Sequence, residues 1–200
     1  AAVREVVGSS VSLRVDANGA YDVDRAIDIL KQLAALSVEC AEQPIPRGAP
    51  EELAAVQAGS PIPVMADESL VTVEDGRALV SARACEYFNL RLSKCGGIRR
   101  TLEIAGEAQR AGVRLQVGCQ VGEVAILSAV GRHLAAYLDD VVYVEGSYGS
   151  MLLSEDIGEE SINFGSGGIG EVLRGPGLGV RVVNERLSSY AESVIELGAG

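Results

Sequence analysis

The sequence predicts an α/β protein built on a parallel sheet, and three observations lead to this class. Short apolar runs of strand length alternate with longer amphipathic segments of helical length. The strand-like runs are apolar throughout, which is typical of a sheet covered on both faces. Strict alternation of strand and helix also implies right-handed crossovers between parallel strands. An open doubly wound sheet and a (β/α)8 barrel both satisfy these observations.

The chain supplies about six βα units. The predicted strands are 11–17, 38–43, 63–68, 86–92, 114–119 and 141–146. The helical patterns between them are 22–36, 49–59, 72–84, 97–112 and 122–138. In the first of these helices Ala26, Ile29, Leu30 and Leu33 recur at helical spacing and form one apolar face. The chain begins inside a further helical pattern, AAVREVVG, as a piece of a longer protein would.

Two domains are predicted, a partial barrel over 1–146 and an excursion over 147–200 that packs back on the barrel or on a cap domain. The second part is rich in Gly and acids, with short β-like pieces (SINFG, GVRVV), a helical stretch and a Gly-rich tail. Its G-x-G-x-x-G string, Gly165 to Gly170, matches the dinucleotide fingerprint. The motif should open a helix after a buried strand, and Pro176 follows it closely instead. A hairpin turn is therefore the favoured interpretation.

Composition excludes several classes of partner. A net charge of −11 and a pI near 4.6 disfavour nucleic acid and an anionic membrane surface. No apolar stretch reaches the roughly 20 residues that span a bilayer, and residues 1–30 hold no signal-peptide pattern, so a cytoplasmic protein is expected. The four cysteines include no C-x-x-C pair and are expected to be reduced core thiols.

Acidic residues end the first three predicted strands at nearly constant spacing. Asp16, Glu42 and Asp67 are separated by 26 and 25 residues, one βα unit each. Because each acid has the same position in its βα unit, a parallel sheet brings all three to its carboxyl edge. Without a counter-charge, the three carboxylates would repel one another there. A shared divalent cation resolves this, and oxygen-only ligands suit Mg²⁺, with Mn²⁺ as the substitute. A single such Asp is more often a turn former, but three in phase favour a metal site.

Two neighbours of these acids also carry expectations. Asn18 follows Asp16 by two residues on the same side of the strand, so it is expected to bind substrate or to brace the metal ligand. Glu68 should point the other way by strand alternation, unless the strand has already ended.

The ordered motifs resemble a known family. VDANGAY, EQPIP, ADES, N-L-x-L-x-K-C-G-G-I, GCQVGE, GRHLA and GPGLGV resemble the barrel domain of the enolase superfamily, in its mandelate racemase and muconate lactonizing branch. The resemblance covers nearly the whole chain. It implies a modified TIM-type barrel with a separate α+β cap, and Asp16, Glu42 and Asp67 as Mg²⁺ ligands. It also implies abstraction of a proton α to the carboxylate of a small-molecule substrate through an enolate, as in dehydratases, cycloisomerases and epimerases.

The resemblance also implies missing parts. The family's D-x-N strand is the third of its barrel, so the cap and the first two strands, one of which carries a K-x-K base, would lie outside this chain. Six strands do not close an eight-stranded barrel, which leaves 11–17 and 141–146 as exposed edges. We therefore expect a fragment, a homo-oligomer, or pairing with the rest of the barrel on another polypeptide. The catalytic base is expected to come from outside the chain.

The position of the second catalytic base, which would face the K-x-K base across the barrel, also departs from the family pattern. By the resemblance, lactonizing enzymes and dipeptide epimerases place a catalytic Lys where this chain has Arg91. Lys94, in the separate K-C-G-G motif, is a further catalytic candidate. Arg stays charged, so Arg91 is a poor base and suits a substrate carboxylate or an enolate. Glu145 and Glu123 are candidate acids, while the one histidine, His133, is expected on a helix surface or cap.

These departures leave three interpretations. A racemase with two opposed bases is disfavoured, whereas β-elimination and cycloisomerisation, which need one base, stay open. The alternative to an enzyme is a non-catalytic truncated barrel that keeps the metal triad and oligomerises. A third interpretation, a response-regulator-like open sheet with an acidic pocket, requires the acids to cluster at one switch point, and here they follow one per strand.

Overall fold

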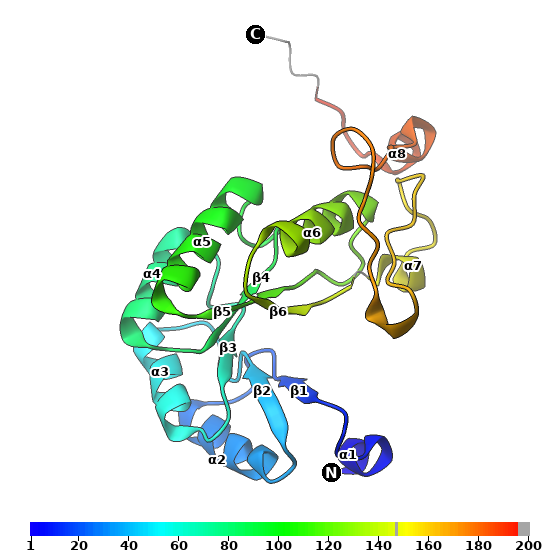
Figure 1. Ribbon diagram of the computed structural model, residues 1–200. Helices are drawn as coiled ribbons and strands as arrows, with labels where there is room; N and C mark the ends of the chain where they lie inside the picture. The colour runs from blue at the N-terminus through cyan, green and yellow to red at the C-terminus, as the bar shows by residue number, and fades with distance from the viewer. Residues whose placement is uncertain (147, 196–200) are drawn as a thin grey trace. The chain divides into compact units, whose positions relative to one another are not determined.

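The computed structural model describes residues 1–146 and 148–195, and its centre is one parallel sheet (Figure 1). Six strands pair in chain order and curl into half of a barrel, with helices on the outer side (Figure 1). The predicted α/β class and partial TIM-type barrel are confirmed. The strands are β1 (Leu13–Asp16), β2 (Val38–Glu42), β3 (Val64–Ala66), β4 (Tyr87–Leu90), β5 (Arg114–Val117) and β6 (Val141–Val144).

The helices follow the predicted positions, each shorter by a few residues. Two of them begin at clear capping residues. Asp22 accepts the backbone N–H of Arg25 at 2.8 Å, and Thr72 forms a capping box with Asp75. The helices are α1 (Ala2–Val7), α2 (Val23–Ala34), α3 (Pro50–Gly59), α4 (Val73–Ala82), α5 (Ile98–Ala111), α6 (Ala125–Tyr137), α7 (Gly149–Leu152) and α8 (Asn184–Tyr190).

The chain forms two compact units. The first comprises 1–118 and 138–144 and holds the whole sheet with α1 to α5. The second comprises 119–137 and 145–200 and holds α6 to α8. The second unit thus takes in α6, which the sequence analysis grouped with the barrel. The domain boundary at residue 146 stays a prediction.

The core of the first unit lies between the sheet and its helices. Phe88 and Leu90 of β4 are fully buried there against Leu53 of α3 and Ile104 of α5. Each such side chain contributes about 1.5–3 kcal/mol by leaving water. The strand residues that face this helix layer are Val38, Ala41, Val64, Ala66, Phe88, Leu90 and Leu115.

The alternate residues of the strands face the inner side of the half-barrel. Cys40, Met65 and Tyr87 form a separate buried cluster there, with Tyr143 packed against it. The pairing of β1 with β2 shifts register so that Glu39 is an extra residue, which lets Val38 and Cys40 point to opposite faces. This bulge puts Glu42 on the inner side with the cluster.

The second unit contains little regular structure outside its helices. Ala125, Ala129 and Ile162 make its buried cluster, and one isolated antiparallel bridge joins Gly158 to Val182. The β-like piece predicted at SINFG is wrong, because none of its residues is in a strand and the carbonyl of Asn163 is bonded to the Arg132 side chain instead of a strand. The Gly-rich tail at 196–200 lies outside the described residues.

A turn lies at the G-x-G-x-x-G string, as predicted, but it is not a hairpin, because no strand flanks it among the described residues. Residues Ser166–Gly168 form a short 3-10 turn, and the N–H of Gly165 donates to the carbonyl of Ile169 at 2.8 Å. The string neither follows a strand nor opens an α-helix, so it lacks the setting of a dinucleotide site.

The cysteines are free thiols, as expected, with Cys40, Cys85 and Cys95 buried and Cys119 half-buried. Among the described helices, none combines the length and the apolar character needed to cross a membrane.

Candidate active site

The loops that follow β1 and β2 are joined by backbone hydrogen bonds. Gly19 donates to the carbonyl of Gln43 at 2.7 Å, and Tyr21 donates to that of Pro44 at 3.2 Å. Gly19 has a φ of 69°, and a Cβ there would lie 3.0 Å from the Cα of Pro46. The glycine of DANGAY is therefore needed for both its left-handed backbone and the close approach of EQPIP. These contacts fix the carboxyl ends of the two strands side by side.

Asp16 ends β1 and is directly opposite Glu42 of β2 in the sheet register. Its Oδ1 accepts the backbone N–H of Asn18 at 2.9 Å, and the residue is exposed. Asn18 has a φ of 47°, a left-handed conformation that Asn tolerates well. Its backbone braces the carboxylate of Asp16. Its predicted role toward a substrate stays a prediction.

Glu42 is buried and held by two amide side chains from strands two and three positions away in the sheet. Asn89 Nδ2 of β4 donates to its Oε1 at 2.5 Å, and Gln116 Nε2 of β5 lies 3.4 Å from its Oε2. Gln116 in turn accepts a bond from Arg14 of β1. Sequence reasoning missed Asn89 and Gln116. The signal for both was a lone amide in the middle of an apolar strand, in FNL and in LQV.

Asp67 is buried one residue beyond β3 and is bound by two cations. Arg91 places its Nε 2.8 Å from Oδ1, and its Nη2 contacts Oδ2, a bidentate pair. Lys94 Nζ donates to Oδ1 and to the backbone carbonyl of Asp67, both at 2.6 Å, and to the carbonyl of Asn89 at 3.1 Å. All three N–H groups of the ammonium therefore have acceptors within this cluster.

Gln43 fixes the segment that carries Asp67. Its Oε1 accepts the backbone N–H groups of Asp67 at 2.9 Å and of Ser69 at 3.1 Å. Its Nε2 donates to the Ser69 hydroxyl at 2.8 Å and to the carbonyl of Ile45 at 2.7 Å. The side chain is fully buried with every polar group satisfied. Gln43 belongs to the EQPIP motif, and its position in the sequence alone does not indicate this role.

The two cations respond differently to their surroundings. Burial is the largest single influence on the pKa of Arg91 and acts to lower it. The charge and hydrogen bonds of Asp67, with the charges of Glu68 and Glu42, together outweigh burial, and the pKa lies above its ordinary value. Burial lowers the pKa of Lys94 below its ordinary value, although Asp67 acts in the opposite direction. Arg91 is thus held in the protonated form, which agrees with the expectation that it is no base.

Glu68 lies nearer to this cluster than strand alternation alone suggests. Because β3 ends at Ala66, alternation no longer governs position 68, and Glu68 Oε1 lies 3.4 Å from Arg91 Nη2. Its other oxygen, Oε2, is buried and has no hydrogen-bond partner among the described residues.

The other candidate residues belong to the second unit. Glu123 is buried, and its Oε1 accepts the backbone N–H of Gln120 at 2.8 Å. His133 lies in α6 with its Nε2 3.0 Å from the carbonyl of Leu178. Glu145 is half-buried directly after β6. Its role as a candidate acid stays a prediction.

The chemical type of the donor atoms suits a hard divalent cation. Asp16, Glu42 and Asp67 offer carboxylate oxygens alone, which are the ligands that Mg²⁺ prefers. Across 1–146 and 148–195, no three His, Cys, Asp or Glu side chains stand close enough to hold an ion as they are arranged. Arg91 and Lys94 occupy the oxygens of Asp67. A dication could use Asp67 only if at least one of these internal cations moved.

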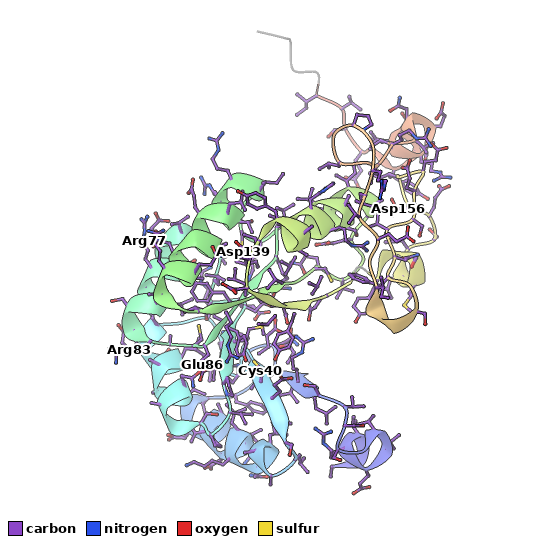
Figure 2. All side chains as sticks on the ribbon, in the orientation of Figure 1. Cys40, Arg77, Arg83, Glu86, Asp139 and Asp156 are labelled. Atoms are coloured by element: carbon purple, nitrogen blue, oxygen red, sulfur yellow. The ribbon has the colours of Figure 1, made fainter. Side chains whose placement is uncertain are left out.

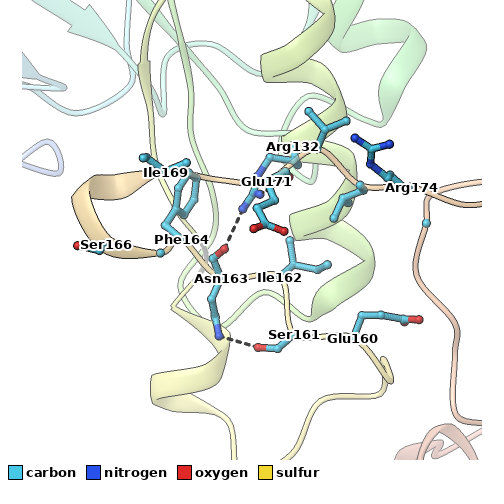
Figure 3. Close-up of a pocket in the computed structure, with 14 residues that line it drawn as sticks. Arg132, Glu160, Ser161, Ile162, Asn163, Phe164, Ser166, Ile169, Glu171 and Arg174 are labelled. Atoms are coloured by element: carbon cyan, nitrogen blue, oxygen red, sulfur yellow. Dashed lines mark hydrogen bonds between the residues drawn. The ribbon is translucent and has the colours of Figure 1, made fainter.

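A pocket of about 700 Å³ lies in the second unit, away from these candidates in sequence (Figure 3). Its wall includes Arg132, which donates to the carbonyls of Glu171 at 2.7 Å and Asn163 at 3.2 Å and stacks on the ring of Phe164. These contacts use the guanidinium as a structural brace. None of the predicted site residues lines this pocket.

Comparison with known proteins supports the resemblance. A model of the enolase C-terminal domain-like family matches residues 1–186. The chain is 33% identical over 185 residues to the L-Ala-D/L-Glu epimerase of Clostridium acetobutylicum, which covers 91% of this chain and 51% of that protein. It is 32% identical over 190 residues to muconate cycloisomerase 1 of Pseudomonas putida, with 95% and 50% covered.

Solved structures give the same answer. The dipeptide epimerase of Cytophaga hutchinsonii, crystallised with Mg and the dipeptide D-Ala-L-Val, superposes with a TM-score of 0.86 at 32% identity, covering 94% of this chain and 50% of that one. The chain spans about half the length of these relatives. The relatives are epimerases, racemases and cycloisomerases, which is consistent with enolate chemistry. The chain therefore belongs to the enolase C-terminal domain-like family, in the mandelate racemase and muconate lactonizing branch of the enolase superfamily.

Proposed function

We propose that this chain carries one half of an active site that removes the proton α to the carboxylate of a small-molecule substrate. The observation that supports this most directly is the gathering of Glu42, Asp67, Arg91 and Lys94 at the carboxyl ends of β2 to β4. In the proposal Asp16, Glu42 and Asp67 hold Mg²⁺, with Mn²⁺ as a substitute. When bound, the ion would stabilise the negative charge that develops on the substrate carboxylate.

Arg91 acts in this proposal as an electrophile and not as a base. Its planar guanidinium can present two parallel N–H groups to a carboxylate, the geometry that it already makes with Asp67. It would hold the substrate carboxylate or stabilise the enolate that forms from it.

Lys94 acts as a positioning residue. Its ammonium ties the backbone and side chain of Asp67 to the carbonyl of Asn89, so it fixes the ends of β3 and β4 relative to each other. Because these three acceptors use all of its donors, Lys94 has none left for a substrate in this arrangement.

The base comes from outside the chain in this proposal, from a second copy or from the polypeptide that completes the barrel. A positioned general base contributes about 10²- to 10⁴-fold to the rate, so proton removal by the chain alone should be slower by that factor. Reactions that need one base, β-elimination and cycloisomerisation, are favoured over racemisation by two opposed bases.

The metal site is tested by thermal unfolding with and without Mg²⁺. At a concentration 100 times the Kd the bound ion would add about 2.7 kcal/mol, or about 5–10 °C in Tm for a chain of this size. The triple variant Asp16→Asn, Glu42→Gln, Asp67→Asn should lose this shift. The matched control, Asp24→Asn, Glu51→Gln, Glu74→Gln, removes three exposed acids and should keep it.

An unchanged wild-type Tm in Mg²⁺ would refute the metal site. The reaction itself is followed by loss of the α-proton NMR signal in D₂O, on a panel of dipeptides, N-acylamino acids and muconate-type dicarboxylates. Exchange that requires Mg²⁺ and disappears in the triple variant supports the proposal. Metal binding by an oligomer that exchanges none of these protons would instead favour the non-catalytic truncated barrel.

A further inference from the structure

Arg91 covers both oxygens of Asp67, the carboxylate that the proposed metal site requires. The pair is bidentate, and its two side chains are only 15% and 3% exposed. A dication therefore meets a competitor that already neutralises Asp67. Lys94 binds the same Oδ1 and also donates to two backbone carbonyls, whereas the Arg91 guanidinium already contacts a second carboxylate, that of Glu68. Of the two cations, Arg91 is therefore the one with another carboxylate to which it can move.

Glu68 offers the guanidinium a second acceptor. It is adjacent to Asp67 in the chain, and its Oε1 already lies 3.4 Å from Arg91 Nη2. Its Oε2 is buried and unsatisfied within the described residues, which is costly for a carboxylate oxygen. A guanidinium that left Asp67 without another carboxylate would be a poorly solvated, unpaired charge. Glu68 removes that penalty.

We propose that Arg91 is an exchangeable counter-ion, which pairs with Asp67 in the metal-free chain and shifts to Glu68 when a divalent cation binds. The inference rests on the proposed metal site and adds a role for two residues that do not ligate the ion. Arg91 competes with the cation for Asp67, and Glu68 is the positioning residue that receives Arg91. The planar fork of Arg suits this exchange because it can engage two neighbouring carboxylates, whereas the single ammonium of a Lys at position 91 could engage both less readily.

The test is the Mg²⁺ affinity of the chain, measured by isothermal titration for the wild type, Arg91→Gln, Glu68→Gln and the double variant. Removal of a charge-assisted, half-buried competitor should tighten binding by about tenfold or more in Arg91→Gln. Glu68→Gln should weaken binding several-fold in the wild type, because the displaced Arg91 has lost its charged acceptor. In the Arg91→Gln background the same Glu68 change should alter the Kd by less than about twofold.

An exposed pair elsewhere supplies the control. Arg77 and Glu107 form a 2.9 Å ion pair on the outer helices, and Figure 2 shows Arg77 on the outer side of that layer. Arg77→Gln and Glu107→Gln repeat the charge changes, and each should leave the Kd within about twofold. If Arg91→Gln fails to fold, Arg91→Met, which also removes the competing charge, replaces it, with tighter binding again expected.

Four results separate the possible failures. Mg²⁺ binding that is unchanged or weaker in Arg91→Gln would overturn the competition. An equal effect of Glu68→Gln with and without Arg91 would overturn the transfer, because it would reflect only the general field of the carboxylate. If no variant binds Mg²⁺, the proposed metal site fails and the exchange fails with it. Binding by Arg91→Gln alone would show that Arg91 blocks the ion without exchanging, and it would overturn the transfer to Glu68.

Discussion

Loss of the Asp67 charge should destabilise the first unit strongly. In the variant Asp67→Asn the shape of the side chain is nearly unchanged, but two cations lose their shared carboxylate. Lys94, whose side chain is 9% exposed, would keep only carbonyl and amide oxygens, and Arg91 would keep Glu68 at 3.4 Å. The new Nδ2 group also donates where the cluster needs an acceptor.

The magnitude follows from the burial of the pair. Removing one partner of a buried ion pair costs about 3–5 kcal/mol because it leaves an uncompensated charge. A typical domain has about 5–15 kcal/mol of stability in total, so this loss is a large fraction. The double variant Asp67→Asn, Lys94→Met removes the stranded ammonium as well. It should be more stable than Asp67→Asn alone by about 1.5 kcal/mol or more, although it carries more changes.

Urea unfolding followed by far-UV circular dichroism measures both variants, in EDTA so that metal binding plays no part. Asp28→Asn, a change of an exposed acid on α2, is the matched control and should stay within about 0.5 kcal/mol of the wild type. A loss below about 1 kcal/mol for Asp67→Asn, or a double variant that is the sum of its parts, would refute the description of this cluster as a coupled buried charge pair.

Two further predictions concern stability. Thr72→Ala should cost about 1 kcal/mol in urea unfolding, because Thr72 accepts the Asp75 N–H and Asp75 accepts that of Thr72, and Thr72→Ser should restore most of it. Burial raises the pKa of Cys40 and of Cys85 to about 12, so each thiol stabilises the fold fully below pH 9 and progressively less as the pH rises toward 12. Their combined loss is about 2.7 kcal/mol per pH unit above pH 9. Cys85→Ala should reduce the measured slope by about 1.4 kcal/mol per pH unit under reducing conditions, and an unchanged slope would refute the assignment.

The fold was predictable because each local signal agreed with the others. The apolar run at 86–92 became β4, and its Phe88 and Leu90 are fully buried. The acid at Asp22 and the box at Thr72 mark helix starts that the structure uses. Predicted strands overran the observed ones at their carboxyl ends, since residues such as Asp67 continue the polar and apolar pattern after the ladder has stopped. Sequence periodicity does not reveal the residue at which backbone pairing between strands ends and the loop begins.

The candidate site was only partly predictable. Its acids were found from their spacing, which depends on the repeat alone. The contacts that organise them are not periodic: Gln43 reaches across to the next strand end, and Asn89 reaches two strands away to Glu42. The strand-like piece predicted at SINFG is wrong for a related reason. A segment of β-like composition forms a strand only where a partner strand is available, and here the Asn163 carbonyl accepts a hydrogen bond from Arg132 instead. Contacts between residues so far apart in the sequence depend on the tertiary fold, and local sequence patterns do not encode them.

At position 91 the side chain that is present, and not the position in the fold alone, decides which chemical role the site residue can have. A Lys there could lose its proton when buried, whereas the guanidinium beside Asp67 has a pKa raised further above its ordinary value. Compared with the catalytic Lys that the family resemblance implies at this position, Arg91 would remove a base and add a permanent cation that can contact two carboxylates. In the absence of metal, Asp67 balances the charge of this cation. If a metal took Asp67, Glu68 could balance it instead, because Arg91 already contacts Glu68 and the other Glu68 oxygen has no partner among the described residues. The same change that argues against two-base chemistry in this chain thus ties the occupancy of its proposed metal site to the position of one side chain.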